Sequence, residues 1–295
     1  MFTKLLKRKL GTLKTKLMAF VYMGEMTKRI HDGVLHDLLD KLKRSPRYQD
    51  PKSLIPFGYS LYSQNEEDGM IREIFNRIGT ANKTFIEFGV GDGLQNNTLA
   101  LLFEGWKGLW IEANDISSQQ ITENFRGTIE RGNLKFIKSF VTKENIDALI
   151  SSAGFPEDVD LLSVDIDGND FHILKAISCV KPRVLALEYN AKFPPPILYC
   201  MNYNGQHEWI HDDCWGASLK FFEVELSKMG YCLVGCCLSG VNAFFVKKEL
   251  VGEKFLSPFT AEHHYEPQRG YFATLPSGHK PSYQALEKML PSLRQ

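Results

Sequence analysis

The feature that most constrains the fold is an alternation of short apolar runs with helix-like segments between residues 84 and 246. The runs are rich in β-branched, leucine and aromatic residues, as buried strands are, and the segments between them carry apolar residues at helical spacing. Strands that alternate with helices form a parallel sheet covered on both faces. The strands expected on this basis are Thr84–Phe88, Gly108–Glu112, Leu134–Phe140, Asp160–Ile166 and Arg183–Tyr189.

The end of the alternating region has a different pattern. A helix over Gly216–Met229 leads into two β-rich runs, Tyr231–Cys237 and Val241–Val246, with only Leu-Ser-Gly between them. A link this short predicts an antiparallel hairpin. The sequence therefore predicts an α/β protein with a seven-stranded, mostly parallel sheet whose last strand runs antiparallel to the others.

Residues 1–50 form a separate region. Basic residues are interleaved with leucines up to Leu17, and apolar residues then recur at helical spacing from Met26 to Leu42, which predicts a basic amphipathic helical arm. Two interpretations stay open: the arm packs on the main domain or on a second subunit of a homo-oligomer, or it touches an anionic membrane face. The expected domains are the arm (1–50), a main domain (51–250) and a C-terminal tail (251–295). The tail is expected to be a lid or an interface, with one helix at Tyr283–Leu290.

The composition excludes several classes of protein. Lys and Arg total 35 and Asp and Glu also total 35, so no global field attracts nucleic acid. The six cysteines show no C-x-x-C spacing, which favours reduced thiols over a zinc site. The apolar run Leu17–Met23 is too short to span a bilayer. We expect a cytoplasmic protein, located at the inner face of the membrane if the arm binds lipid.

A glycine loop follows the first strand in the sequence TFIEFGVGDG (84–93). Gly89, Gly91 and Gly93 alternate with other residues there, and such a loop lets the backbone approach a ligand while the next helix offers free N–H groups. A dinucleotide fingerprint has its third glycine one residue later, where this chain has Leu94. With the acidic Glu87 before the glycines, the loop suits a sulfonium nucleoside better than a pyrophosphate.

Two polar residues outside the loop are also expected near this ligand. Glu112 ends the second strand, where a carboxylate can accept hydrogen bonds from both ribose hydroxyls. Gln64 belongs to a capping-box pattern, Ser63 to Glu66, that opens a helix just ahead of the first strand. From the first turn of that helix, Gln64 is expected to meet a cofactor.

Several of these segments, taken together, resemble the FkbM-like branch of class I S-adenosylmethionine-dependent methyltransferases, over roughly residues 57–250. The segments that carry the resemblance are SQNEEDG (63–69), FIEFGVGDG (85–93), WIEAN (110–114), LLSVDIDGND (161–170), ALEYNAKF (186–193) and GYCLVGCCLSGVNAFFV (230–246).

The resemblance implies a Rossmann-like methyltransferase fold and an O-methyltransferase that acts on a hydroxyl group of a sugar or glycan, as in polysaccharide biosynthesis. It implies that Glu87 and the three glycines surround the methionine portion of S-adenosylmethionine and that Glu112 binds the ribose. Ser139 and Phe140 would lie against the adenine, and Asp165 near the amino group or the sulfonium.

The ends of the fourth and fifth strands carry oxygen ligands. These strands are expected to be neighbours, and Asp165, Asp167, Glu188 and Asn190 follow or end them. Because the set contains only oxygen donors, it suits Mg²⁺ or Mn²⁺ better than zinc. Asp167, Glu188 and Asn190 are therefore the candidate ligands of a divalent metal that would assist the reaction.

A sugar hydroxyl also needs a general base. Related metal-dependent O-methyltransferases have an Asp-Gly-x-His step at this point, and here Asp170 stands where the histidine would be. Asp167 and Asp170 are thus catalytic candidates, although both could merely cap the following helix. The alternative bases are His207 and His211 in the insert at 191–215.

The same insert is expected to bind the acceptor, because aromatic faces stack on sugars. Two other functions remain open: an NAD(P)-dependent Rossmann oxidoreductase, which Leu94 disfavours, and a non-catalytic partner in glycan assembly. The aromatic candidates are Tyr199, Tyr203, Trp209 and Trp215.

Overall fold

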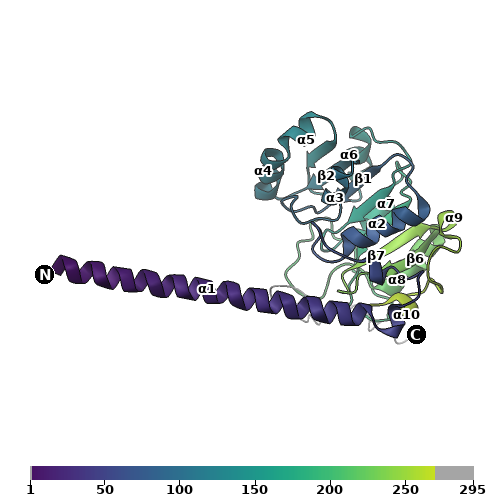
Figure 1. Ribbon diagram of the computed structural model, residues 1–295. Helices are drawn as coiled ribbons and strands as arrows, with labels where there is room; N and C mark the ends of the chain where they lie inside the picture. Colours follow the sequence, from purple (N-terminus) through teal and green to yellow (C-terminus); the bar gives the residue numbers. More distant parts are fainter. Residues whose placement is uncertain (1, 270–295) are drawn as a thin grey trace. The chain divides into compact units, whose positions relative to one another are not determined.

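A computed structural model describes residues 2–269, and the chain divides into two compact units, Met1–Gln49 and Asp50–Gln295. The first unit contains α1 (Phe2–Lys43), a single uninterrupted helix (Figure 1). Within residues 2–269, no helix combines the length and the apolar character needed to cross a membrane. The helix expected at Tyr283–Leu290 lies outside the described residues.

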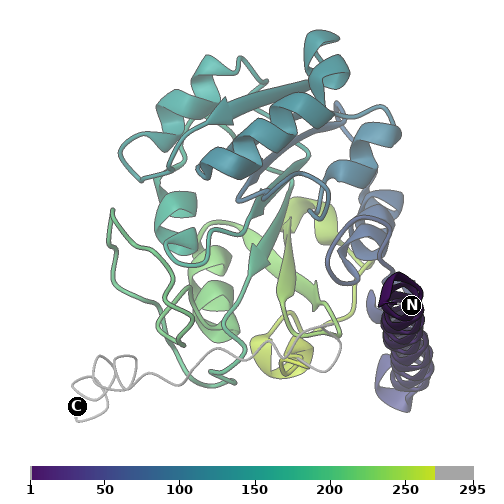
Figure 2. The ribbon, with the colours of Figure 1, turned by 90° about the vertical axis from the view of Figure 1, so that its left-hand side faces the viewer.

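The second unit is built on a seven-stranded sheet with the order β3-β2-β1-β4-β5-β7-β6 (Figures 1 and 2). Strands β1 to β5 pair in parallel, whereas β7 pairs antiparallel with both β5 and β6. The predicted Rossmann-like α/β fold is therefore confirmed, including its antiparallel last strand. The strands are β1 (Thr84–Phe88), β2 (Lys107–Glu112), β3 (Leu134–Lys138), β4 (Leu161–Val164), β5 (Val184–Glu188), β6 (Tyr231–Cys236) and β7 (Asn242–Lys247).

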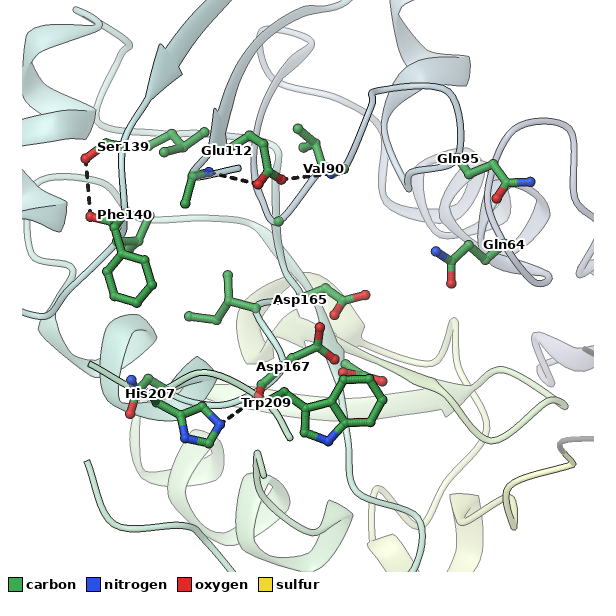
Figure 3. A pocket seen from close by; sticks show the side chains of 18 residues that line it. Gln64, Val90, Gln95, Glu112, Ser139, Phe140, Asp165, Asp167, His207 and Trp209 are labelled. Atoms are coloured by element: carbon green, nitrogen blue, oxygen red, sulfur yellow. Dashed lines mark hydrogen bonds between the residues drawn. The ribbon is translucent and has the colours of Figure 1, made fainter. Parts of the chain in front are cut away.

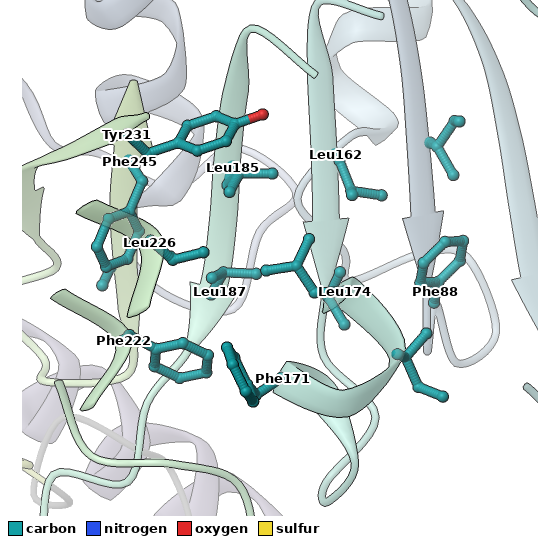
Figure 4. Close-up of a cluster of buried hydrophobic side chains, with 14 of the residues drawn as sticks. Phe88, Leu162, Phe171, Leu174, Leu185, Leu187, Phe222, Leu226, Tyr231 and Phe245 are labelled. Atoms are coloured by element: carbon teal, nitrogen blue, oxygen red, sulfur yellow. The ribbon is translucent and has the colours of Figure 1, made fainter. Parts of the chain in front are cut away.

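Helices cover both faces of this sheet. One face packs against α6, α7 and α8, and their apolar side chains join Phe88, Leu162 and Leu187 in one buried cluster (Figure 4). Trp110 projects to the opposite face, because side chains alternate along a strand, and its ring contacts Phe125 between α4 and α5. The helices are α2 (Glu67–Ile78), α3 (Leu99–Phe103), α4 (Asp115–Asn124), α5 (Arg126–Glu130), α6 (Ile146–Ser152), α7 (Asp170–Ala176), α8 (Leu219–Lys228), α9 (Lys248–Val251) and α10 (Ala261–His264).

Two helices between β2 and β3 were not predicted. Only Ser118 and Ile121 of α4 are buried, and no residue of α5 is, so neither helix shows a clear apolar stripe. A signal was nevertheless present, because the side chain of Asn114 accepts hydrogen bonds from the backbone N–H groups of Ile116 and Ser117. Asparagine is among the preferred N-caps, so Asn114 marked the start of a helix.

The start of α2 differs from the predicted capping box. Ser63 pairs with Asp68 rather than with Glu66: the Ser63 hydroxyl donates to the Asp68 carboxylate at 2.9 Å and accepts from the Asp68 N–H at 3.2 Å. The same carboxylate accepts the backbone N–H groups of residues 61, 62 and 63. Glu66 instead accepts from the N–H of Ser239, at 3.3 Å. These contacts fix the segment that carries Gln64.

The described part of the C-terminal tail continues the main domain. Tyr189 at the end of β5 donates its hydroxyl hydrogen to the carbonyl of Glu266, and Tyr265 donates to the carbonyl of Ala191, each at 2.6 Å. Phe255 is buried as well. Residues 251–269 therefore pack on the sheet and on the segment that follows β5.

Candidate active site

A cavity of about 510 Å³ lies at the carboxyl ends of the parallel strands (Figure 3). Ligands of open α/β sheets bind at this edge, and the volume suits a small organic ligand. Each of the first five strands contributes the residues at its end, and α2, α3 and the insert complete the walls through the segments next to them. The lining residues are Gln64, Gly89, Val90, Gly91, Gln95, Ile111, Glu112, Ala113, Ser139, Phe140, Val141, Asp165, Ile166, Asp167, Asn169, Glu188, His207 and Trp209.

The three loop glycines have different roles, although all have positive φ. A Cβ atom on Gly89 would lie 1.7 Å from the carbonyl oxygen of Asp165, so close packing of two loops requires this glycine. A Cβ atom on Gly93 would lie 2.8 Å from the Trp110 ring, and Gly93 is not among the lining residues. A Cβ atom on Gly91 would have no other atom within 4 Å, so the backbone at Gly91 is open toward the cavity.

Glu112 holds the glycine loop at the mouth of the cavity. One carboxylate oxygen accepts the N–H of Gly91 at 2.9 Å, and the other accepts the N–H groups of Ala113 and Asn114, both at 2.8 Å. Two carboxylate oxygens offer about four acceptor positions, so capacity remains for a ligand hydroxyl. The carboxylate is thus fixed in place beside the ends of β1 and β2.

Glu87 lines a small adjoining pocket, which shares Gln64, Gly89, Gln95 and Asp165 with this cavity, rather than the cavity itself. Its side chain is buried, and one oxygen accepts from the Asn97 N–H at 2.9 Å and from the Ser163 hydroxyl at 3.2 Å. The other oxygen accepts from the hydroxyl of Thr98, which in turn accepts from the Trp110 indole N–H at 2.8 Å. Burial raises the pKa of Glu87 to about 7. Glu87 therefore anchors the segment that follows the glycine loop.

The opposite wall of the cavity is acidic. Carboxylate oxygens of Asp165, Asp167 and Glu188 lie within 4.8 Å of one another. Burial raises the pKa of both Asp165 and Glu188 well above the usual range, and the neighbouring carboxylates raise them further. Burial also raises the pKa of Asp167, whereas His207 and His211 oppose that change. The described residues that line the cavity include neither Lys nor Arg, so the site favours a positively charged ligand.

The acidic cluster fits a divalent cation in its donor set. Oxygen ligands are those that Mg²⁺ and Mn²⁺ prefer. Within the described residues, the buried Oε2 of Glu188 has no hydrogen-bond partner, which is costly for a carboxylate without a cation or proton. Asp165, Asp167 and Glu188 are therefore the residues that would hold such an ion.

Asn190 does not belong to this cluster, contrary to the expected ligand set. It is fully buried, and its amide nitrogen donates to the carbonyls of Asp213 at 3.0 Å and Trp215 at 3.1 Å. Its side-chain oxygen accepts from the N–H of Lys192 at 3.2 Å. These bonds hold the end of the insert, and Asp165, which was one of the expected oxygen donors but not one of the candidate ligands, joins Asp167 and Glu188 in the cluster.

Asp170 is also turned away from the cavity, which corrects its proposed role as a base. The carboxylate accepts the backbone N–H groups of Ile166 at 3.0 Å and Gly168 at 2.9 Å, and it has no exposed surface. Burial raises its pKa to about 6. Asp170 therefore stabilises the loop between β4 and α7 rather than capping the helix.

The insert contributes His207 and Trp209 to the cavity. The Nε2–H of His207 donates to the carbonyl of Asp167 at 3.1 Å, which leaves Nδ1 as the nitrogen able to accept a proton. His211 is not among the lining residues, and its ring lies 4.3 Å from that of Trp209. Of the aromatic candidates, Tyr199 and Trp215 are buried in the fold, and Tyr203 lies outside the lining, where its hydroxyl donates to Glu144 at 2.7 Å, which leaves Trp209 as the one that lines the cavity.

Some lining residues were missed by sequence reasoning. Gln95 follows the glycine loop directly, and its side chain faces the same cavity as Gln64 (Figure 3). Its position between the loop and α3 was the available signal, because this segment faces the ligand in glycine-loop folds. Val141, just after β3, is another such residue.

Comparison with known proteins gives likenesses of fold. Neither a protein-family model nor a curated protein sequence matches the chain. One similar solved structure is a putative caffeoyl-CoA O-methyltransferase from Staphylococcus aureus, with 13% identity and a TM-score of 0.45, covering 74% of this chain and 99% of that chain. Another is the N-terminal domain of EvdMO1 with SAH bound, with 15% identity and a TM-score of 0.42, covering 69% and 98%.

A third similar structure is a precorrin-6y C5,15-methyltransferase from Geobacter metallireducens GS-15, with 14% identity and a TM-score of 0.31. The match covers 45% of this chain and 66% of the methyltransferase chain. All three TM-scores lie below 0.5, so these likenesses indicate nothing about the activity, substrate or cofactor of this chain.

Proposed function

We propose that the protein is an S-adenosylmethionine-dependent O-methyltransferase that methylates a hydroxyl group of a sugar or glycan, assisted by Mg²⁺ or Mn²⁺. The observation that carries the proposal is the charge of the cavity. Its described lining contains the four carboxylates of Glu112, Asp165, Asp167 and Glu188, and neither Lys nor Arg.

This charge distribution favours a sulfonium nucleoside over a dinucleotide. S-adenosylmethionine carries a positive sulfonium, a positive amino group and one negative carboxylate, so its net charge is positive and carboxylates of the protein attract the two cationic groups. A pyrophosphate would bring negative charge into the same acidic cavity, which disfavours an NAD(P)-dependent oxidoreductase. With one acceptor position of its carboxylate still open, Glu112 can accept a hydrogen bond from a ribose hydroxyl, and Phe140 offers an apolar side chain for the adenine.

The acceptor hydroxyl would bind between the acidic cluster and the insert. A divalent cation held by Asp165, Asp167 and Glu188 would lower the pKa of the hydroxyl. We assign the role of general base to His207, because its Nε2–H donates to the carbonyl of Asp167 and Nδ1 is then the nitrogen able to accept a proton. Trp209 presents an aromatic face on which a sugar ring can stack.

The methyl group itself passes directly from sulfur to the hydroxyl oxygen. The carbon–sulfur bond breaks as the carbon–oxygen bond forms, so the protein's main task is to align the two partners and exclude water. The loops after β1 and β2 would hold the cofactor, and the insert would hold the acceptor opposite it.

The test is transfer of a radiolabelled methyl group from S-adenosylmethionine to a panel of sugars that are free, nucleotide-linked or lipid-linked. We expect labelled methyl ether, with a rate that falls by at least about tenfold in His207→Gln, as for loss of a general base. His211→Gln is the matched control and should retain activity, because His211 does not line the cavity. Methylation of amines but of no hydroxyl would contradict the proposal.

A further inference from the structure

The first part of α1 has an unusual charge pattern. Before Glu25 the chain contains no acidic residue, whereas the remainder of α1 mixes acidic and basic residues and contains the ion pair between Lys41 and Asp37. The excess of positive charge is therefore confined to residues 2–24. The basic residues there are Lys4, Lys7, Arg8, Lys9, Lys14 and Lys16.

Seven of the large apolar residues of this segment occupy one side of the helix. An α-helix turns by about 100° per residue, so these seven positions come together within an arc of about 100°, whereas Leu5, Met18, Tyr22 and Met23 fall outside it. The exposed side chains of Phe20 and Val21, with 71% and 50% of their surface accessible, belong to this arc. The positions are Phe2, Leu6, Leu10, Leu13, Leu17, Phe20 and Val21.

Lysines border this apolar arc on both sides. By the same geometry, positions 9 and 16 lie just beyond one edge and positions 7 and 14 just beyond the other. Lysine side chains in such positions can lay their methylene chains along an apolar layer while the ammonium groups reach phosphate groups. The arrangement suits a helix that lies in the plane of a lipid interface.

We propose that residues 2–24 of α1 bind the surface of an anionic bilayer. The six positive charges complement anionic lipid headgroups, and the apolar arc fits the boundary between headgroups and acyl chains. A second copy of the segment is a poorer occupant of this face, because two uniformly basic helices repel each other. Within the described residues, no helix is suited to crossing a membrane, which agrees with binding in the interface plane. This inference does not depend on the proposed activity.

The test is co-sedimentation of the full-length protein with vesicles of phosphatidylcholine, with and without phosphatidylserine. We expect binding to the vesicles that contain phosphatidylserine, weakened strongly at high salt because salt screens the headgroup charge. The double substitution Lys14→Glu with Lys16→Glu should weaken binding by on the order of tenfold or more. The double substitution Leu13→Gln with Leu17→Gln should weaken it comparably, through loss of apolar burial.

Matched controls make the same chemical changes elsewhere in α1. Arg29→Glu with Lys41→Glu repeats the charge reversal, and Ile30→Gln with Val34→Gln repeats the polar replacement at exposed positions. Both controls should keep near-parent binding, and circular dichroism should show equal helix content in all variants. Equal loss in variants and controls, or equal binding to neutral vesicles, would overturn the proposal. So would an absence of vesicle binding accompanied by self-association in sedimentation velocity.

Discussion

Replacing Glu87 by Gln tests the buried network beneath the glycine loop. In the folded protein, burial raises the pKa of Glu87 from an ordinary 4.5 to about 7. Gln resembles the protonated carboxyl, because it has one oxygen to accept from Asn97 and Ser163 and one donor that can face the Thr98 hydroxyl. Glu87→Gln should therefore match the parent protein at low pH and differ from it at high pH.

The sign and size of this difference follow from the pKa. A carboxyl with a raised folded-state pKa binds its proton more tightly when folded, so its contribution to stability is full below pH 4.5 and is lost as the pH rises through about 7. At about 1.4 kcal/mol per pKa unit, the total is about 3 kcal/mol. Above that range, Glu87→Gln should be more stable than the parent by up to this amount, on the order of 5–10 °C in Tm.

The assay is thermal and urea unfolding of both proteins from pH 5 to pH 8.5, with EDTA present and without cofactor. Titrating groups that do not interact with Glu87 act equally in both proteins and cancel in the difference between the two curves; Asp68 and Asp165 interact with Glu87, so their contributions remain in that difference. Glu130→Gln is the matched control, because Glu130 is exposed and its substitution should leave the pH profile unchanged. A constant difference between Glu87→Gln and the parent across the whole range would refute the reasoning.

Three further outcomes are expected. Gly89→Ala should prevent stable folding, because its Cβ atom would lie 1.7 Å from a backbone carbonyl oxygen. Gly91→Ala should fold but bind S-adenosylhomocysteine weakly. Equal Tm values for the two variants in thermal unfolding would contradict this expectation. Glu112→Gln should weaken binding in calorimetry by about 1.5–3 kcal/mol, the range for a hydrogen bond to a charged group, and no change would exclude a ribose contact. Asp167→Asn should keep cofactor affinity but lose the stabilisation by Mn²⁺ and the methyl transfer; retained transfer would argue against both roles.

The sheet could be predicted because its signals are local and repeated. Each strand is a short apolar run, and the order of runs and helices leaves few topologies. The strand ends were predicted less well: β3 stops at Lys138 and β4 at Val164, because the next residues leave the ladder to line the cavity. The mostly polar helices α4 and α5 were missed for lack of a buried stripe.

The candidate site could be predicted as far as parallel strands determine it. Glu112, Asp165 and Asp167 come together because the carboxyl ends of parallel strands meet at one edge of the sheet. The direction in which each side chain points is not determined by the strand order. Glu87 lies near the end of β1 but its side chain points beneath the glycine loop, and the Asp170 carboxylate binds backbone N–H groups of its own loop. Sequence spacing alone does not distinguish these carboxylates.

The insert was the least predictable part of the site. It has no periodic pattern, so nothing in the sequence separates Trp209, which lines the cavity, from Trp215, which is buried in the fold. The same holds for His207 and His211, four residues apart, of which His207 lines the cavity. The positions of these side chains depend on contacts with the segments after β4 and β5. These contacts join residues far apart in the sequence, so local patterns do not reveal them.

The most direct test of the account is a calorimetric titration of the purified protein with S-adenosylhomocysteine and, separately, with NAD, each with and without Mn²⁺. The acidic cavity predicts micromolar binding of S-adenosylhomocysteine and no measurable binding of NAD. Binding of NAD without binding of S-adenosylhomocysteine would contradict the central claim that this site holds a sulfonium nucleoside.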